Sequence, residues 1–247
     1  MQTQPPWQTV PAAITLLPGD IHVWRAGLDV DPAALNLFRQ TLAPDELARA
    51  ERFVSPIHRD RYVAGRGILR ALLARYLCGL PNQFSFRLNE YGKPALATGS
   101  VSVDLRFNLS HSQGMALYAF TLGREVGVDV EFIRPLGRDL RLAERFFSPQ
   151  EVKGLRALSP SALAEAFFHC WTRKEAYIKA RGAGLSIGLS SFSVSLAADT
   201  LTHLPIIGHD GPEAGRWWLR ALSPDEGYVG AVSAEGADWG LKLWLWK

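Results

Sequence analysis

Trp-Thr-Arg-Lys-Glu-Ala-Tyr-Ile-Lys, residues 171–179, is the stretch that indicates most about how this chain folds. Trp171, Glu175 and Lys179 are four residues apart, and a helix with about 3.6 residues per turn places such positions on one face. Most neighbouring side chains are apolar, which indicates a largely buried helix, and buried charges need partners. Glu175 and Lys179 are therefore expected to meet charged groups from elsewhere in the chain. The alternative is a surface ion pair between the two, which would stabilise the chain little.

A matching pair of carboxylates lies upstream, in Gly-Val-Asp-Val-Glu at residues 127–131. Asp129 and Glu131 alternate with valines, so on a strand both carboxylates point to the same face. Two like charges side by side are costly unless a cation or solvent compensates them. The pair could be a solvated strand end beside Arg134. With Glu175 added, the three would supply the oxygen ligands that magnesium on a phosphate ester prefers.

A six-residue echo indicates how the chain is organised. Glu-Arg-Phe-Val-Ser-Pro at 51–56 recurs as Glu-Arg-Phe-Phe-Ser-Pro at 144–149. A helical stretch follows each copy, at about 60–80 and 160–180, and strand-like segments follow each helix. We expect these strands at 83–88, 101–108, 115–121, 191–196, 216–222, 228–233 and 241–246. The sequence thus predicts two similar α+β halves, residues 1–123 and 124–247, with a ligand cleft where they meet.

Composition narrows the class of protein. Of 247 residues, 47% are hydrophobic and 21% charged, as in ordinary soluble domains. No apolar run approaches the roughly 20 residues of a membrane helix, and no charged region precedes the apolar residues 10–17, so we expect neither a membrane span nor a signal peptide. Cys78 and Cys170 have no metal-site spacing. We interpret them as buried free thiols of a cytoplasmic protein.

The charge of the chain is a weaker indication of function than its composition. A net charge of +3 is too small to predict nucleic-acid binding. Arginines are nevertheless concentrated in one helical region, and they could hold phosphates or an acidic partner. The alternative is a solvated helix face paired with nearby acidic residues. The cluster comprises Arg49, Arg52, Arg59, Arg61, Arg66, Arg70 and Arg75.

Two further segments carry polar groups. Asn-Leu-Ser-His-Ser at 108–112 follows an expected strand, where Ser110 and His111 could donate to phosphate oxygens. A Ser–His nucleophile pair is disfavoured, because adjacent residues on an extended chain point apart. Tyr-Gly-Lys-Pro at 91–94 indicates a turn with Lys93 at its centre.

Taken together, these motifs resemble the surfactin-type 4′-phosphopantetheinyl transferases. Five segments match in order, and the resemblance covers about residues 42–194. The segments are EYGKP at 90–94, NLSHS at 108–112, GVDVE at 127–131, FFSPQE at 146–151 and WTRKEAYIKARGAGL at 171–185. The resemblance implies a pseudo-dimer of two similar α+β halves with the active site at their interface. It also implies an enzyme that transfers 4′-phosphopantetheine from coenzyme A to a carrier-protein serine and releases 3′,5′-ADP.

The resemblance also assigns roles by position. Asp129, Glu131 and Glu175 would bind magnesium, Glu175 would also be the candidate base for the carrier serine, and Lys179 would neutralise phosphate charge. Lys93 would lie near the nucleotide, and Arg49 and Arg61 would hold its phosphates. Arg66 is a weaker match. The full set implied to contact coenzyme A is Arg49, Arg61, Arg66, Lys93, Asn108, Ser110, His111 and Lys179.

The resemblance implies two partners of the protein. They are coenzyme A and an acidic acyl or peptidyl carrier protein, which would dock near residues 182–193. We expect a cytoplasmic monomer that binds neither nucleic acid nor membrane. Two alternatives stay open. One is a carrier- or coenzyme A-binding module without transfer activity; the other is a different magnesium-dependent phosphoryl-transfer enzyme using the same carboxylates.

Overall fold

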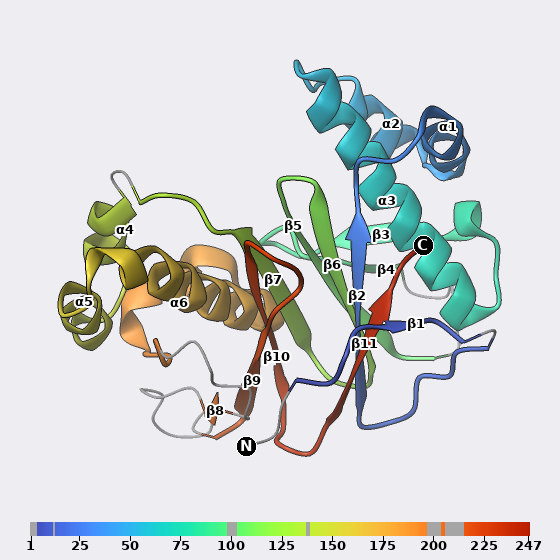
Figure 1. Cartoon of the computed structure of the whole chain (residues 1–247). Coiled ribbons are helices and arrows are strands. Elements are labelled where there is room, and N and C mark those ends of the chain that lie inside the picture. The colour runs from blue at the N-terminus through green and yellow to red at the C-terminus, as the bar shows by residue number, and fades with distance from the viewer. Residues whose placement is uncertain (1–3, 12, 98–102, 137–138, 197–203, 206–214) are drawn as a thin grey trace.

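Figure 1 shows a computed structural model of the chain, in which two β-sheets lie between two groups of helices. The structure describes residues 4–11, 13–97, 103–136, 139–196, 204–205 and 215–247. Long helices and antiparallel sheets coexist, so the predicted α+β class is confirmed. None of the helices in these ranges is long and apolar enough to cross a membrane.

The first sheet has five strands in the order β1-β11-β2-β6-β5. Three helices and a small hairpin belong to the same part of the chain. The strands are β1 (Gln8–Thr9), β2 (Asp20–Gly27), β5 (Leu105–Ser112), β6 (Met115–Leu122) and β11 (Gly240–Leu245). The other elements are α1 (Pro32–Thr41), α2 (Pro44–Ala50), α3 (Pro56–Leu77), the 3₁₀ turn η1 (Pro81–Gln83), β3 (Phe86–Leu88) and β4 (Pro94–Leu96).

The second sheet has four strands in the order β7-β10-β9-β8. Its strands are β7 (Val126–Phe132), β8 (Leu204–Pro205), β9 (Trp217–Leu222) and β10 (Tyr228–Glu235). Its helices are α4 (Asp139–Phe146), α5 (Pro149–Arg156) and α6 (Pro160–Arg181), followed by the 3₁₀ turns η2 (Gly184–Ser186) and η3 (Leu189–Ser191).

The two sheets pack face to face through a shared apolar layer. Val23 and Leu117 of the first sheet contact Val128, Val130 and Val232 of the second, and all five are fully buried. This agrees with the alternation read from residues 127–131, in which the valines face the core. Helix α3 covers the outer face of the first sheet and α6 that of the second (Figure 1).

The halves share a repeated arrangement that differs from the six-residue echo. The echo ends at the start of α3 in one half but at the start of α5 in the other. Structurally, the two 22-residue helices α3 and α6 correspond. Each follows a short helix, α2 or α5, whose N-terminus is capped by a glutamate side chain. Glu46 caps α2 through the Ala43 N–H, and Glu151 caps α5 through the Ser148 N–H. The echo is therefore out of register with the structural repeat.

Several sequence predictions need correction. The strand expected at 191–196 is absent, because that segment forms η3 and then irregular backbone. The stretch 108–112 continues strand β5 and is no loop, and residues 101–102 of the expected strand lie outside the described ranges. Cys78 is exposed, since the αL conformation that ends α3 turns it outward; Cys170 is buried as expected.

The C-terminal strand returns to the first sheet. β11 pairs in parallel with β2, although it belongs to the sequence half that follows residue 124. The strands of the first sheet thus come from both ends of the chain. The boundary between residues 123 and 124 stays a prediction.

Candidate active site

Helix α6 lies against β7 at a contact only glycine allows. A Cβ on Gly127 would lie 2.1 Å from the carbonyl oxygen of Ala176. This close approach places one face of α6 beside the carboxylates of β7. Trp171, Glu175 and Lys179 are the partly exposed positions in a run of otherwise buried residues, so they share a face as predicted. Trp171 itself packs on Phe146, Phe147 and Phe167.

Three polar side chains of β5 bridge the junction between the sheets. The Asn108 Oδ1 accepts from the Val128 N–H at 2.9 Å. The Ser110 hydroxyl donates to Asp129 at 2.7 Å, and the Ser112 hydroxyl donates to Glu131 at 2.7 Å. Because alternate residues of a strand share a face, the spacing of two along β5 matches the spacing of two along β7.

Lys179 supplies the cation at this junction. Its ammonium donates to Oδ1 of Asp129 at 2.6 Å and to the Ser110 hydroxyl at 2.9 Å. The Asp129 carboxylate is only 3% exposed. Its other oxygen, Oδ2, is buried and has no hydrogen-bond partner among the described residues. A buried, unpaired carboxylate oxygen retains strong capacity for a cation.

The electrostatics of Glu175 are the most unusual of the group. Burial, together with the negative charges of Asp129 and Glu131, raises the pKa of Glu175 to about 7, although Lys179 opposes the shift. Burial and Asp129 also raise the pKa of Glu131 above its ordinary value, against the Ser112 hydrogen bond. The negative charge of Asp129 is thus close enough to disfavour ionisation of both Glu131 and Glu175.

The donor set suits a hard divalent cation, but it is not closed around one point. Within the described ranges, no group of three or more His, Cys, Asp or Glu side chains is arranged to hold a metal ion. The carboxylate chemistry, the unpaired Asp129 Oδ2 and the mutual repulsion nevertheless fit magnesium. Lys179 holds the Asp129 Oδ1 in this arrangement.

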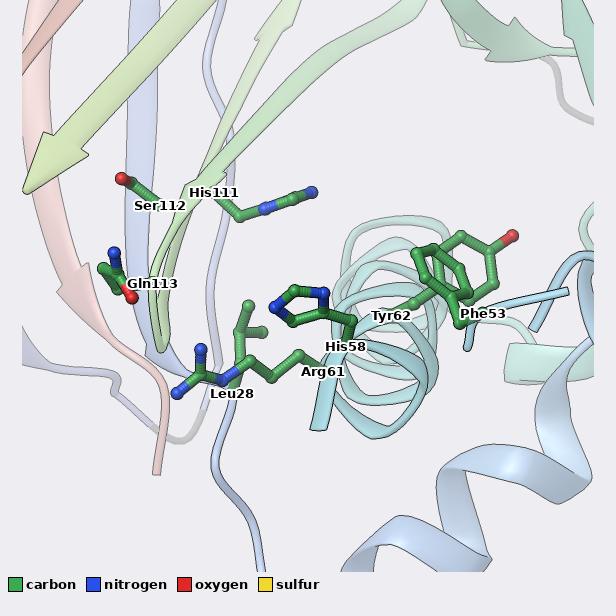
Figure 2. A pocket seen from close by; sticks show the side chains of 8 residues that line it. All are labelled: Leu28, Phe53, His58, Arg61, Tyr62, His111, Ser112 and Gln113. Carbon is green, nitrogen blue, oxygen red and sulfur yellow. The ribbon is translucent and has the colours of Figure 1, made fainter. Parts of the chain in front are cut away.

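A cavity of about 380 Å³ is lined in part by His111 and by Ser112, the hydrogen-bond partner of Glu131 (Figure 2). His111 extends from the end of β5 toward α3, from which His58 and Arg61 extend into the same space, while Ser112 points away on the other side of the strand. Partial burial and the nearby Lys179 lower the pKa of His111. Arg61 is held by two hydrogen bonds to Asp29, at 2.7 and 2.8 Å.

A second cavity, of about 400 Å³, lies along α6. Glu175 and Lys179 form part of its wall, and Asn108 and Lys93 line it as well. The Lys93 ammonium is already engaged: it donates to Glu125 at 2.7 Å and to the carbonyl oxygen of Ala180 at 2.9 Å. This lysine therefore ties the β3–β4 turn to the end of α6.

Two predicted arginines do not line these cavities directly. Arg66 pairs with the buried Glu46 at 2.5 Å and stacks over the Phe86 ring. Arg49 lies over the ring of Tyr62, whose side chain lines the 380 Å³ cavity. The structure thus places Arg61 and His111 in the same cavity. Arg49 contacts Tyr62 in the wall of that cavity, and Arg66 is paired with Glu46.

Comparison with known proteins matches both halves of this arrangement. The model described as the 4′-phosphopantetheinyl transferase superfamily matches residues 125–233, and the model described as 4′-phosphopantetheinyl transferase, N-terminal, matches residues 30–121. The 4′-phosphopantetheinyl transferase HetI of Nostoc sp. is 41% identical over 96% of this chain and 97% of its own. The chain belongs to the 4′-phosphopantetheinyl transferases. The enzyme class predicted from the motifs is confirmed.

Other transferases are similar over much of the chain. The enzyme psf-1 of Bacillus pumilus is 37% identical over 68% of this chain and 70% of its own. Sfp of Bacillus subtilis strain 168 is 30% identical over 81% and 85%, respectively. The N-terminal family match ends at residue 121, within β6 of the first sheet, and the superfamily match begins at residue 125, just before β7 of the second sheet.

The sequence prediction assigned no individual role to two residues of this transferase's candidate site. Ser112 is the hydrogen-bond partner of Glu131, and it could have been found from the period of two that it shares with Asn108 and Ser110 on β5. His58 lines the cavity with Arg61, three residues later on α3. Nothing in the local pattern around His58 distinguishes it from a surface histidine.

Proposed function

We propose that this transferase moves the 4′-phosphopantetheine group of coenzyme A onto a serine of an acyl or peptidyl carrier protein. In this reaction the serine oxygen forms a bond to the phosphorus that carries pantetheine. The bond from that phosphorus to the bridging pyrophosphate oxygen breaks, and 3′,5′-ADP leaves. The serine proton goes to a base on the enzyme, directly or through water.

The observation that carries the proposal is the gathering of Asp129, Glu131, Glu175 and Lys179 from β7 and α6 at the sheet junction. A base, charge neutralisation and alignment are what attack by a hydroxyl on a phosphate ester requires. Glu175 fits the base, because it is a carboxylate that lines the cavity along α6 beside Lys179. Lys179 fits the charge-neutralising group.

Magnesium would be held by Asp129, Glu131 and Glu175. When bound, it would polarise the pyrophosphate and offset the charge that develops on it. A bound cation would also lower the pKa of Glu175, because it reverses the repulsion from its neighbours. Glu175 would then be the ionised residue beside the incoming serine at neutral pH.

Coenzyme A would lie across the two cavities that flank this group. Arg61 and His111 would hold phosphate oxygens in the 380 Å³ cavity, with Arg49 at its edge. Lys93 and Asn108 would lie near the nucleotide in the cavity along α6. Ser110 and Lys179 both contact Asp129, and Lys179 also lines the cavity along α6, so Lys179 would contact the pyrophosphate. Arg66 would first have to leave Glu46.

The carrier protein is the second substrate. An acidic carrier would be attracted by the net positive charge of the chain, which has 27 Lys and Arg against 24 Asp and Glu. We propose docking at residues 182–193, next to the end of α6. Carrier affinity should then weaken as ionic strength rises. The monomeric state and the cytoplasmic location expected from the sequence stay predictions.

The experiment that tests this function is to incubate the protein with coenzyme A, magnesium and several apo-carriers, and to weigh each carrier. Addition of phosphopantetheine to a carrier, with 3′,5′-ADP released, supports the proposal. Binding without any mass change would instead indicate a module without transfer activity. Release of phosphopantetheine in the absence of a carrier would indicate a different phosphoryl-transfer enzyme.

A further inference from the structure

Beneath the candidate active site lies a buried ion pair that the proposed chemistry does not use. Lys174 and Glu151 are 2.8 Å apart, and their side chains are 0% and 2% exposed. Lys174 directly precedes Glu175, yet its side chain points in a different direction, toward Glu151 of α5. It lines neither of the two cavities that flank the carboxylates.

This pair holds the backbone that follows α6. The Lys174 ammonium donates to the carbonyl oxygens of Leu189 and Phe192, at 2.8 and 2.6 Å. The Glu151 carboxylate accepts from the Val194 N–H at 2.7 Å. Both ends of the turn η3 are thus tied to charges that belong to helices. Ser193 adds a hydrogen bond to Ser148 at the start of α5.

The first half of the chain contains an equivalent buried ion pair. Arg70 pairs with Glu46 at 2.6 Å, and their side chains are 1% and 4% exposed. Arg70 also donates to the carbonyl oxygens of Pro81, the first residue of η1, and Phe84, which follows the turn. Arg70 is the 15th residue of α3, which starts at Pro56, just as Lys174 is the 15th of α6, which starts at Pro160. In both halves a buried cation joins a capping glutamate to a 3₁₀ turn.

We infer that Glu151 and Lys174 are positioning residues that set the shape of the carrier-docking segment. Four anchored residues, Leu189, Phe192, Ser193 and Val194, leave Ser186, Gly188, Ser190 and Ser191 exposed on the outer face. A segment held in one shape binds a partner without first being ordered. The inference rests on the proposed transfer reaction and on docking at 182–193.

The charges of the pair make its removal informative. Truncating one member of a buried ion pair leaves the other uncompensated, whereas replacing both by neutral groups does not. Lys174→Met is therefore compared with the double variant Lys174→Met with Glu151→Gln. In that variant the single amide oxygen keeps one of the two hydrogen bonds that the carboxylate oxygens accept from the Ser148 and Val194 N–H groups. Arg70→Met is the matched control, because it breaks the equivalent pair in the other half.

The test measures steady-state transfer and hydrogen–deuterium exchange in these variants, well below their melting temperatures. In Lys174→Met and in the double variant we expect the KM for the carrier to rise about tenfold, because the segment must be ordered on binding. The KM for coenzyme A should change less than twofold, and the amides of residues 189–194 should exchange faster. Arg70→Met should leave the carrier KM and this exchange unchanged.

An unchanged carrier KM in both the single and the double variant would overturn the inference, as would an equal rise in Arg70→Met. If Lys174→Met does not fold, the double variant and Glu151→Gln alone decide the question. Wild-type protein that transfers nothing would refute the proposed function. Exchange at 189–194 would still report on the anchoring, so the two failures are distinguishable.

Discussion

The ammonium of Lys179 lies 2.6 Å from Oδ1 of Asp129, and the Ser110 hydroxyl is hydrogen-bonded to both groups. Helix α6 supplies the cation and strand β7 the anion, across the contact that Gly127 makes possible. The same ion pair thus joins the helix to the sheet and brings a positive charge to the proposed pyrophosphate site.

Replacing this lysine should therefore affect both stability and rate. In Lys179→Met, Asp129 loses its cation inside the protein, and we expect a loss of about 1–3 kcal/mol in the free energy of unfolding, because Lys179 is partly exposed. Transfer should slow by ~10²-fold. Urea unfolding and carrier modification measure the two effects. Lys242→Met, which breaks the more exposed pair with Asp20, is the control and should cost under ~1 kcal/mol.

The raised pKa of Glu175 predicts a specific pH dependence of stability. Because the folded state holds this proton up to a pKa of about 7, the free energy of unfolding should fall as pH rises from about 4.5 to 7. Glu175→Gln removes the penalty. Without magnesium, we expect the variant to gain at most ~3 kcal/mol over wild type at pH 8 and nothing at pH 4.

The control for this series is Glu165→Gln, an exposed carboxylate on the same helix. It should show no such pH-dependent gain. If the free energy of unfolding of Glu175→Gln follows that of wild type from pH 4 to pH 8, burial and the neighbouring carboxylates do not raise the pKa of Glu175.

Asp129 is the proposed magnesium ligand with an unpaired oxygen, so its replacement should raise the metal requirement. In Asp129→Asn we expect at least ~10-fold more magnesium for half-maximal transfer, because a charged oxygen ligand is lost. The readout is the transfer rate against magnesium concentration. Asp104→Asn, at an exposed position, should leave the curve unchanged. If Asp129→Asn shows the same dependence of rate on magnesium as wild type, Asp129 is not a ligand of the metal.

Arg61 is the arginine best placed for coenzyme A. Arg61→Ala should raise the KM for coenzyme A by about 10-fold, the effect of losing one charged hydrogen bond to phosphate, and leave the KM for the carrier unchanged. Arg39→Ala, which removes an ion-paired arginine on α1, is the matched control. Equal KM values for Arg61→Ala and wild type would place the phosphates elsewhere.

Much of the candidate site could be predicted because it depends on local periodicity. The alternation at Asp129 and Glu131 gives one strand face, and the spacing of Glu175 and Lys179 gives one helix face. Only the family resemblance indicated that these faces meet. The contact itself depends on Gly127 fitting against Ala176, a packing relation between residues 49 positions apart.

What the sequence did not predict is set by distant pairing. Residues 191–196 have the composition of a strand, yet they form none, and Lys174 and Glu151 bind the backbone groups of Phe192 and Val194. β11 fits its local strand pattern, but nothing local indicates that it joins β2. Arg66 and Arg70 resemble phosphate ligands in sequence, but buried Glu46 engages both.

The most direct test of the central claim is the rate at which Glu175→Gln converts an apo-carrier, followed by the carrier's mass in the presence of coenzyme A and magnesium. Glutamine keeps the shape of the side chain but can neither take the serine proton nor bind the metal as a carboxylate. We predict transfer at least ~10²-fold slower than wild type, although the variant stays folded. Near-normal conversion would contradict the assignment of Glu175 and, with it, the proposed chemistry at the junction of β7 and α6.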